Sequence, residues 1–117
     1  MGAASSRSEN EAAAAEFVDR VTTENGVTVF SKSYCPYCNL AKGVLDEAGV
    51  KYHVVELDLK SDVPTGADIQ SALAAATGRR TVPNVFIKKE SIGGGTDVQA
   101  LFQSGKLTEM LRTAGVL

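Results

Sequence analysis

The feature that most constrains this chain is a pair of cysteines, two residues apart, between a predicted strand and a predicted helix. Cys35-Pro36-Tyr37-Cys38 follows the β-branched run at residues 27–30, which is typical of a short buried strand. Proline is favoured in the first turn of a helix, where its missing N–H costs nothing. The motif therefore predicts a helix that begins here, with the Cys35 sulfur beside free backbone N–H groups.

The rest of the chain alternates apolar residues at helical spacing with short apolar runs. We expect strands at residues 27–30, 52–57 and 85–87 and a short one around Ile92. Helices are expected from Ser8 to Gly26, from the cysteine pair to Gly49, up to Gly78, from Val98 to Gly105, and from Leu107. This order predicts an α/β fold with both parallel and antiparallel strand pairs.

Length and composition limit the function classes. The 117 residues are enough for one domain, and 44% of them are hydrophobic. A net charge of −2 argues against a nucleic-acid partner, and the lack of a long apolar run argues against stable membrane insertion. We expect a flexible N-terminal tail at residues 1–9, a domain at residues 10–117 and a cytoplasmic protein. Gly2 and Ser6 match the myristoylation pattern, and a single acyl chain would give weak, reversible membrane association.

The cysteine pair itself allows three chemistries. Two such cysteines are half of a zinc site, but the chain has no second pair and only one histidine, so zinc would require two chains. A nucleophilic Cys/His pair with His53 is less favoured, because a lone histidine in a strand is usually structural. Thiol–disulfide exchange is the best interpretation: the helix N-terminus and Lys32 favour a thiolate at Cys35, and Cys38 is the resolving thiol.

Two weaker motifs lie further along the chain. Thr81-Val82-Pro83 precedes a strand, and a cis bond before Pro83 would turn the Val82 backbone outward, where it could pair with an extended peptide. Alone, it is more simply a proline at the start of a strand. The run Gly93-Gly94-Gly95-Thr96-Asp97 precedes a helix and offers amides suited to a carboxylate, although alone it is also a flexible hairpin end.

Taken together, these motifs resemble a dithiol glutaredoxin of the CPYC-bearing class I, within the thioredoxin-fold superfamily. The resemblance covers about residues 17–111. It implies a thioredoxin-like fold, a central four-stranded mixed β-sheet flanked by α-helices, with the cysteine loop beside a cis-proline. It rests on the segments at residues 32–38, 69–70, 77–87, 93–94 and 96–97.

The resemblance implies a catalytic pair, Cys35 and Cys38, and glutathione as co-substrate, with no metal. Cys35 would carry the glutathionyl disulfide. The implied glutathione-binding residues are Lys32, Tyr37, Gln70, Arg79, Thr81, Val82, Pro83, Gly94, Gly95, Thr96 and Asp97.

By the same resemblance, each part of glutathione has its own subsite. Lys32 and Gln70 would hold the glycine carboxylate, with help from Arg79. The Val82 backbone would pair with the glutathione cysteine, and Pro83 would fix that geometry.

The γ-glutamyl end of glutathione would lie at the glycine-rich run. Its carboxylate would bind the amides of residues 94–96 and the Thr96 hydroxyl, and its amine would lie near Asp97. Many dithiol relatives carry a third cysteine where this chain has Gly95, so no role for such a thiol is expected here.

The implied function is an enzyme, a glutathione-disulfide oxidoreductase that reduces protein–glutathione mixed disulfides and protein disulfides. We expect a monomer whose partners are glutathione and glutathionylated or disulfide-containing proteins. The alternative is a homodimer that binds a [2Fe–2S] cluster through Cys35 and glutathione. Cluster-binding relatives usually carry a smaller residue in place of Pro36, which makes this alternative the less favoured one.

Overall fold

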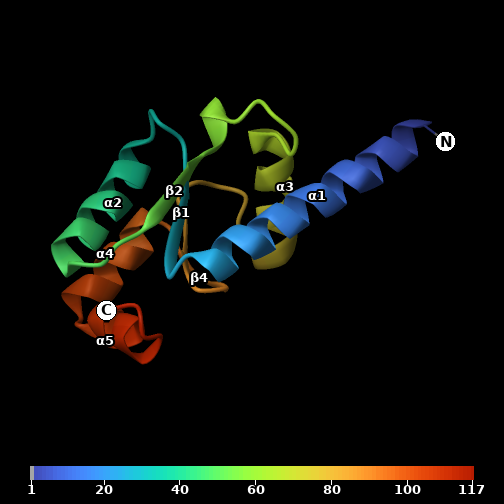
Figure 1. Ribbon diagram of the computed structural model, residues 1–117. Helices are drawn as coiled ribbons and strands as arrows, with labels where there is room; N and C mark the ends of the chain where they lie inside the picture. Colours follow the sequence, from blue (N-terminus) through green and yellow to red (C-terminus); the bar gives the residue numbers. More distant parts are fainter. Residues whose placement is uncertain (1) are drawn as a thin grey trace.

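A four-stranded mixed sheet forms the centre of the molecule (Figure 1). The computed structural model describes residues 2–117, with side chains from residue 9 onward. The strands are β1 (Val27–Ser31), β2 (His53–Glu56), β3 (Asn84–Ile87) and β4 (Glu90–Gly93), in the spatial order β2-β1-β3-β4. β1 is parallel to β2 and antiparallel to β3, and β3 is antiparallel to β4. The expected four-stranded mixed sheet is therefore confirmed.

Helices cover both faces of this sheet (Figure 1). On one face α1 (Gly2–Glu24) packs against α3 (Gly66–Thr77); on the other, α2 (Pro36–Ala48) packs against α4 (Gly95–Gln103). A short 3₁₀-helix, η1 (Leu57–Leu59), follows β2, and α5 (Lys106–Thr113) follows α4. The predicted order of helices and strands is confirmed.

The two faces of β1 belong to two separate hydrophobic cores. Val27 and Val29 are fully buried in the core beneath α2, α4 and α5, whereas Phe30 is fully buried in the core beneath α1 and α3. A central strand that is covered on both faces has no solvent-exposed side. The β1 sequence therefore reads as an unbroken buried run, and its carboxyl end lies where the cysteine pair begins.

The boundaries of α2 and α3 follow local capping chemistry. Pro36 stands in the first turn of α2, and Gly49 ends that helix with a φ of 78°. The Thr65 hydroxyl and the Asp68 carboxylate form a reciprocal cap at the start of α3, and Gly78 ends it with a φ of 77°. The predicted glycine stops at Gly49 and Gly78 are confirmed.

Predicted boundaries differ from the observed ones at several places. α1 begins at Gly2, not at Ser8, so the expected tail boundary at residue 9 falls inside this helix. The second strand ends at Glu56, because Leu57 is already part of η1. α4 begins at Gly95 instead of Val98. The Asp97 carboxylate accepts the N–H of the N-cap residue Gly94 and so stabilises a helix that begins at Gly95. Met1 lies outside the described residues, and the division into tail and domain stays a prediction.

Among residues 2–117, no helix combines the length and the apolar character that crossing a bilayer requires.

Candidate functional site

Cys35 is the N-cap residue of α2, as the sequence predicted. Its backbone is extended, with φ −91° and ψ 116°, and its Sγ accepts the backbone N–H of Cys38 at 3.2 Å. Cys35 is partly exposed and Cys38 is fully buried, and both thiols are free. The first turn of α2 therefore holds one accessible sulfur, directed at a helix N-terminus, and one sulfur behind it.

Burial makes the Cys38 thiol a weaker acid. It raises the pKa of this thiol above its ordinary value of 9.0, and the hydrogen bond with Cys35 and the Cys35 charge raise the pKa further. Contacts with the Lys32 backbone and the Ser31 side chain act in the opposite direction and are weaker than burial. At neutral pH Cys38 is therefore held as a neutral thiol.

The backbone before β3 lies against the exposed sulfur. The Val82–Pro83 peptide bond is cis, as the resemblance implied. The carbonyl oxygen of Val82 lies 3.9 Å from Cys35 Sγ, although 47 residues separate the two along the chain. The fold thus brings the Thr81-Val82-Pro83 motif into contact with the cysteine motif.

A carboxylate from η1 fixes the loop that precedes Cys35. Asp58 accepts the backbone N–H of Ser33 at 2.9 Å and also the Ser33 hydroxyl. These hydrogen bonds lower the pKa of the Asp58 carboxyl, and the nearby charge of Lys32 adds to the effect. The sequence analysis missed Asp58, because nothing local indicates its pairing with a residue 25 positions away.

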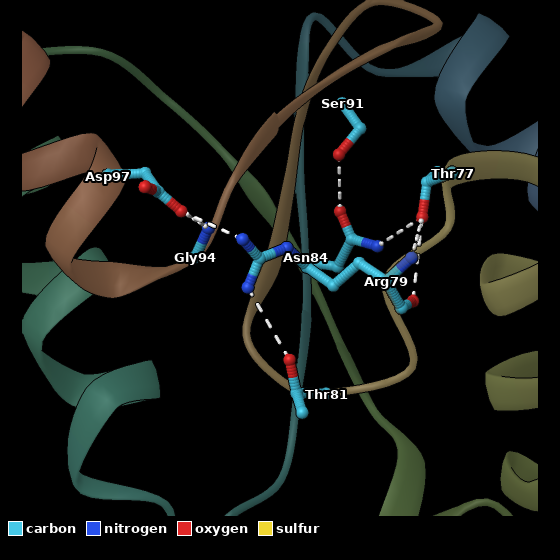
Figure 2. Close-up of polar contacts among 7 residues, drawn as sticks. All are labelled: Thr77, Arg79, Thr81, Asn84, Ser91, Gly94 and Asp97. Carbon is cyan, nitrogen blue, oxygen red and sulfur yellow. Dashed lines mark hydrogen bonds and ion pairs between the residues drawn. The ribbon is translucent and has the colours of Figure 1, made fainter.

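Figure 2 shows an ion pair at the start of α4. Arg79 Nη2 lies 2.9 Å from Asp97 Oδ2, and Arg79 Nη1 donates to the Thr81 hydroxyl at 3.4 Å. The same Asp97 oxygen accepts the Gly94 N–H at 2.8 Å. The Arg79 guanidinium therefore lies beside Asp97 at the start of α4, and its role at the glycine carboxylate stays a prediction.

A buried polar network supports this ion pair (Figure 2). Asn84 is fully buried; its amide nitrogen donates to Thr77 Oγ1 at 3.2 Å and its amide oxygen accepts from Ser91 at 2.7 Å. Thr77 Oγ1 also accepts the Arg79 N–H at 3.1 Å. With both ends of the amide bonded, Asn84 fixes the end of α3 relative to β3 and β4.

Glycine is required where α4 meets the cysteine motif. A Cβ atom at Gly95 would lie 2.6 Å from the Tyr37 carbonyl oxygen, and one at Gly94 would lie 2.9 Å from Arg79 Nη1. At Gly95 the α4 backbone directly approaches the Tyr37 backbone, whereas at Gly94 the nearest atom is the end of the flexible Arg79 side chain. The first N–H groups of α4 are thereby held next to the first turn of α2.

The remaining predicted residues line this region without direct contacts to the sulfurs. Tyr37 and its neighbour Tyr34 are 61% and 71% exposed, Thr96 is exposed, and Lys32 is partly exposed. Gln70 donates from its amide nitrogen to the Arg80 carbonyl at 2.8 Å. The structure assigns no contact between Gln70 and Lys32 that would define a shared subsite.

Two alternative chemistries receive no support from the geometry. His53 is exposed at the amino end of β2, whereas Cys35 follows the carboxyl end of the parallel strand β1, so the two lie at opposite ends of the sheet. Within the described part of the chain, no three side chains of histidine, cysteine, aspartate or glutamate are grouped so that they could hold a metal ion.

The sheet order and an accessible thiol paired with a buried one at a helix N-terminus define a thioredoxin-fold protein with a dithiol site. Comparison with known proteins identifies the family of this chain.

Residues 27–92 match the glutaredoxin family. A glutaredoxin from Ricinus communis is 50% identical over 97 residues, which cover 83% of this chain and 92% of that protein. Glutaredoxin-C2 from Arabidopsis thaliana is 47% identical over 97 residues, covering 83% of this chain and 85% of its own.

The structural comparison agrees. The crystal structure of a buckwheat glutaredoxin–glutathione complex superimposes with a TM-score of 0.86 at 41% identity, covering 93% of this chain and 96% of that one. The chain belongs to the glutaredoxin family, and its fold is the thioredoxin fold. It is thus a member of a family of glutathione-linked thiol–disulfide oxidoreductases.

Proposed function

We propose that this chain is a dithiol, class I glutaredoxin that uses glutathione to reduce protein–glutathione mixed disulfides and protein disulfides. The observation that carries the proposal is the position of Cys35: its Sγ is accessible, is the N-cap of α2 and accepts the Cys38 N–H at 3.2 Å. Backbone N–H groups at a helix N-terminus stabilise a thiolate relative to a thiol. Cys35 is therefore the attacking thiol and the buried Cys38 is not.

The reaction has two exchange steps. The Cys35 thiolate attacks the glutathione sulfur of a glutathionylated protein, a Cys35–glutathione disulfide forms, and the protein thiol leaves. In the first route a second glutathione attacks the glutathione sulfur of this disulfide, forms glutathione disulfide and releases the Cys35 thiolate. In the second route the Cys38 thiol attacks the Cys35 sulfur and releases glutathione. The second route leaves an internal Cys35–Cys38 disulfide, which two glutathione molecules reduce. A protein disulfide enters by the same attack of Cys35 on one of its sulfurs.

The proposed glutathione site extends from the cysteine motif to the start of α4. The Val82 backbone, 3.9 Å from Cys35 Sγ, is suited to pair with the glutathione cysteine. At the γ-glutamyl end, Asp97 offers a carboxylate to the ligand ammonium, and Arg79 with the first amides of α4 offers cationic and N–H partners to the ligand carboxylate. The glutathione complex of the buckwheat relative supports this ligand.

The other end of glutathione is assigned by sequence resemblance. Lys32 and Gln70 are proposed to bind the glycine carboxylate, with Tyr37 along the groove. Lys32 is partly exposed and therefore accessible to a ligand carboxylate. For Gln70 the amide must exchange its bond to the Arg80 carbonyl for the ligand.

The decisive experiment is steady-state reduction of a glutathionylated peptide by glutathione, in wild type, Cys35→Ser and Cys38→Ser. We expect Cys35→Ser to be inactive and Cys38→Ser to keep most of this activity, because glutathione itself can resolve the intermediate. Reduction of an intramolecular protein disulfide should be lost in both variants. An inactive wild type would contradict the enzyme proposal, and brown protein after purification without oxygen would favour the cluster-binding dimer instead.

A further inference from the structure

Exposed hydrophobic side chains lie at the same end of the molecule as the cysteine motif. Leu59, the last residue of η1, and Val63, in the loop before α3, are 69% and 68% exposed. Tyr34, which directly precedes Cys35, is exposed as well. Figure 1 shows the β1–α2 loop, η1 and the loop before α3 together at this end of the sheet. Tyr34, Leu59 and Val63 are termed the apolar patch below.

Two hydrogen bonds bring Tyr34 and Leu59 together. Ser33 donates to the Asp58 carboxylate from its backbone N–H at 2.9 Å and also from its hydroxyl. Tyr34 follows Ser33, and Leu59 follows Asp58, so each lies one Cα step of about 3.8 Å from a member of this bonded pair. The backbone segments that carry Tyr34 and Leu59 are therefore held next to each other beside the reactive sulfur.

The Lys60 side chain holds the segment that carries Val63. Its ammonium donates to the carbonyl oxygens on either side of Val63, those of Asp62 at 3.3 Å and of Pro64 at 2.7 Å. The same ammonium lies 5.0 Å from the centre of the Phe17 ring on α1. The loop therefore presents Val63 in one position, and a surface that is ordered beforehand loses little entropy when a partner binds.

The grouping of these side chains calls for a partner. Single exposed apolar residues are common on protein surfaces, whereas a group of them on ordered backbone is typical of an interaction site. None of the three residues of the apolar patch is among those proposed to bind glutathione. The apolar patch is therefore available to the remainder of the substrate.

The charges near the apolar patch are engaged by other groups. Asp58 accepts from Ser33, and Asp62 pairs with Lys60 at 3.1 Å. Lys32 is proposed to bind the glycine carboxylate of glutathione. The apolar patch therefore attracts a partner mainly through the burial of apolar surface, not through charge.

We propose that the apolar patch binds the polypeptide of the disulfide substrate, through apolar side chains next to its reactive cysteine. This inference rests on the proposed function and adds the class of protein substrate that the site prefers. At the moment of attack, the substrate sulfur is still bonded to the glutathione sulfur that Cys35 attacks. The residues that flank the substrate cysteine therefore lie over the surface next to Cys35, and the apolar patch adjoins Cys35 through Tyr34. The exchange step itself is unchanged: the Cys35–glutathione bond forms and the protein leaves as its thiolate.

The test compares substrates with and without apolar flanking residues. Two glutathionylated peptides differ only in the residues on each side of the cysteine, leucine in one and serine in the other. Cysteine–glutathione disulfide is the third substrate and has no flanking residues. Reduction by glutathione is measured for the full-length wild type, Leu59→Ser, Val63→Ser and the double variant. The matched control is Leu117→Ser, which changes an exposed leucine beyond α5.

We expect the wild type to favour the leucine peptide over the serine peptide about fivefold in kcat/KM, the effect of partly burying apolar side chains. The double variant should lose this preference, with kcat/KM for the leucine peptide reduced about fivefold, and each single variant should lose part of it. Substitutions at exposed positions leave the fold intact, so all variants should reduce the serine peptide and cysteine–glutathione disulfide within about twofold of wild type. Leu117→Ser should match the wild type on every substrate.

The same kcat/KM for the leucine peptide in the wild type and the double variant would overturn the inference. Equal loss on all three substrates would do the same, because it would assign the effect to the position of Cys35. A wild-type dimer in analytical ultracentrifugation that is absent from the double variant would assign the apolar patch to a second copy of the chain, which also overturns the inference. A wild type that does not reduce cysteine–glutathione disulfide would be a different result: it would contradict the proposed function, and the inference with it.

Discussion

The Asp97 carboxylate binds the Arg79 guanidinium at 2.9 Å through the same oxygen that caps Gly94. The two side chains are 50% and 35% exposed, so solvent screens their interaction. Ion pairs of this kind contribute only about 0.2–1 kcal/mol to stability. A ligand that brings its own ammonium and carboxylate groups can therefore replace each partner at little cost.

The first prediction concerns Asp97→Asn. The amide keeps the size of the side chain and an acceptor for the Gly94 N–H, but it loses the charge that would attract the ligand ammonium. We expect KM for glutathione to rise about five- to tenfold and kcat to stay within about twofold of wild type. This rise corresponds to the lower end of the energy range for a charge-assisted hydrogen bond, because the site is partly exposed. Steady-state reduction of a glutathionylated peptide at varied glutathione measures both constants.

The matched control for Asp97→Asn is Asp19→Asn on α1, which pairs with Lys89 far from the thiols. It should leave both constants unchanged. An Asp97→Asn variant with the wild-type KM would mean that the ligand ammonium binds elsewhere.

The second prediction concerns selective alkylation. Iodoacetamide at neutral pH should label one thiol of the folded, reduced protein, at Cys35, because Cys38 is fully buried and burial raises its pKa. Labelling of Cys38 should require unfolding. Peptide mapping by mass spectrometry identifies the labelled residue, and equal labelling of both thiols would contradict the buried position of Cys38.

The raised pKa of Cys38 also fixes a direction for the pH dependence of stability. In the folded protein Cys38 keeps its proton at pH values where the unfolded chain loses it. Its contribution to the free energy of unfolding is therefore complete below about pH 9 and falls as the pH rises further. The stability difference between reduced wild type and Cys38→Ala should shrink above that pH.

The third prediction concerns the anchor between Asp58 and Ser33. Hydrogen bonds from Ser33 lower the pKa of Asp58, so the folded state favours the carboxylate. These hydrogen bonds are therefore intact at pH values above 3.8, the ordinary pKa of an aspartate. They are lost as the pH falls through the lowered pKa of Asp58. The amide resonance of Ser33 should shift with this titration in an NMR experiment.

Removal of the same anchor should affect activity at neutral pH. Asp58→Ala leaves the Ser33 N–H and hydroxyl without their acceptor, so the loop before Cys35 loosens. We expect kcat/KM to fall about three- to tenfold, since small displacements of a nucleophile are costly. Asp62→Ala, in the same exposed segment, pairs with Lys60 instead and is the control. Equal activity of both variants would show that the anchor does not position Cys35.

The fourth prediction compares two glycines. Gly95→Ala places a Cβ atom 2.6 Å from the Tyr37 carbonyl oxygen and should lower the free energy of unfolding by about 1–3 kcal/mol. Gly43→Ala, in the middle of α2, meets no atom within 4 Å and should raise stability by about 0.5–1 kcal/mol. Denaturant unfolding measures both, and a neutral Gly95→Ala would mean that α4 shifts freely against α2.

Features that depend on neighbours along the chain were predictable from the sequence. The start of α2 at Pro36 and the glycine stops at Gly49 and Gly78 follow from local capping and backbone preferences. The burial of β1 follows from its short β-branched and aromatic run at residues 27–30. The start of α1 was not predictable in this way. Ser8 is a favourable helix cap, but the segment between Gly2 and Ser8 contains no strong helix breaker, and the helix begins earlier.

Features that depend on packing between distant segments were not predictable. The direction of the Arg79 side chain depends on where α4 lies relative to the end of α3, so its ion pair with Asp97 was not predictable from the sequence. The pairs Ser33–Asp58 and Lys42–Glu56 join side chains from separate elements, and no spacing rule relates them. Both contacts depend on how β2 and η1 lie beside β1 and α2.

The exposed tyrosines beside Cys35 have a practical consequence. The chain contains three tyrosines and no tryptophan, and Tyr34 and Tyr37 flank the accessible sulfur, whereas Tyr52 bonds to Asp46 on the far side of α2. Two of the three emitting rings therefore lie beside the reacting sulfur in the chain, where we expect a disulfide to lower their emission. Tyrosine emission should then report the redox state of Cys35 without an added dye.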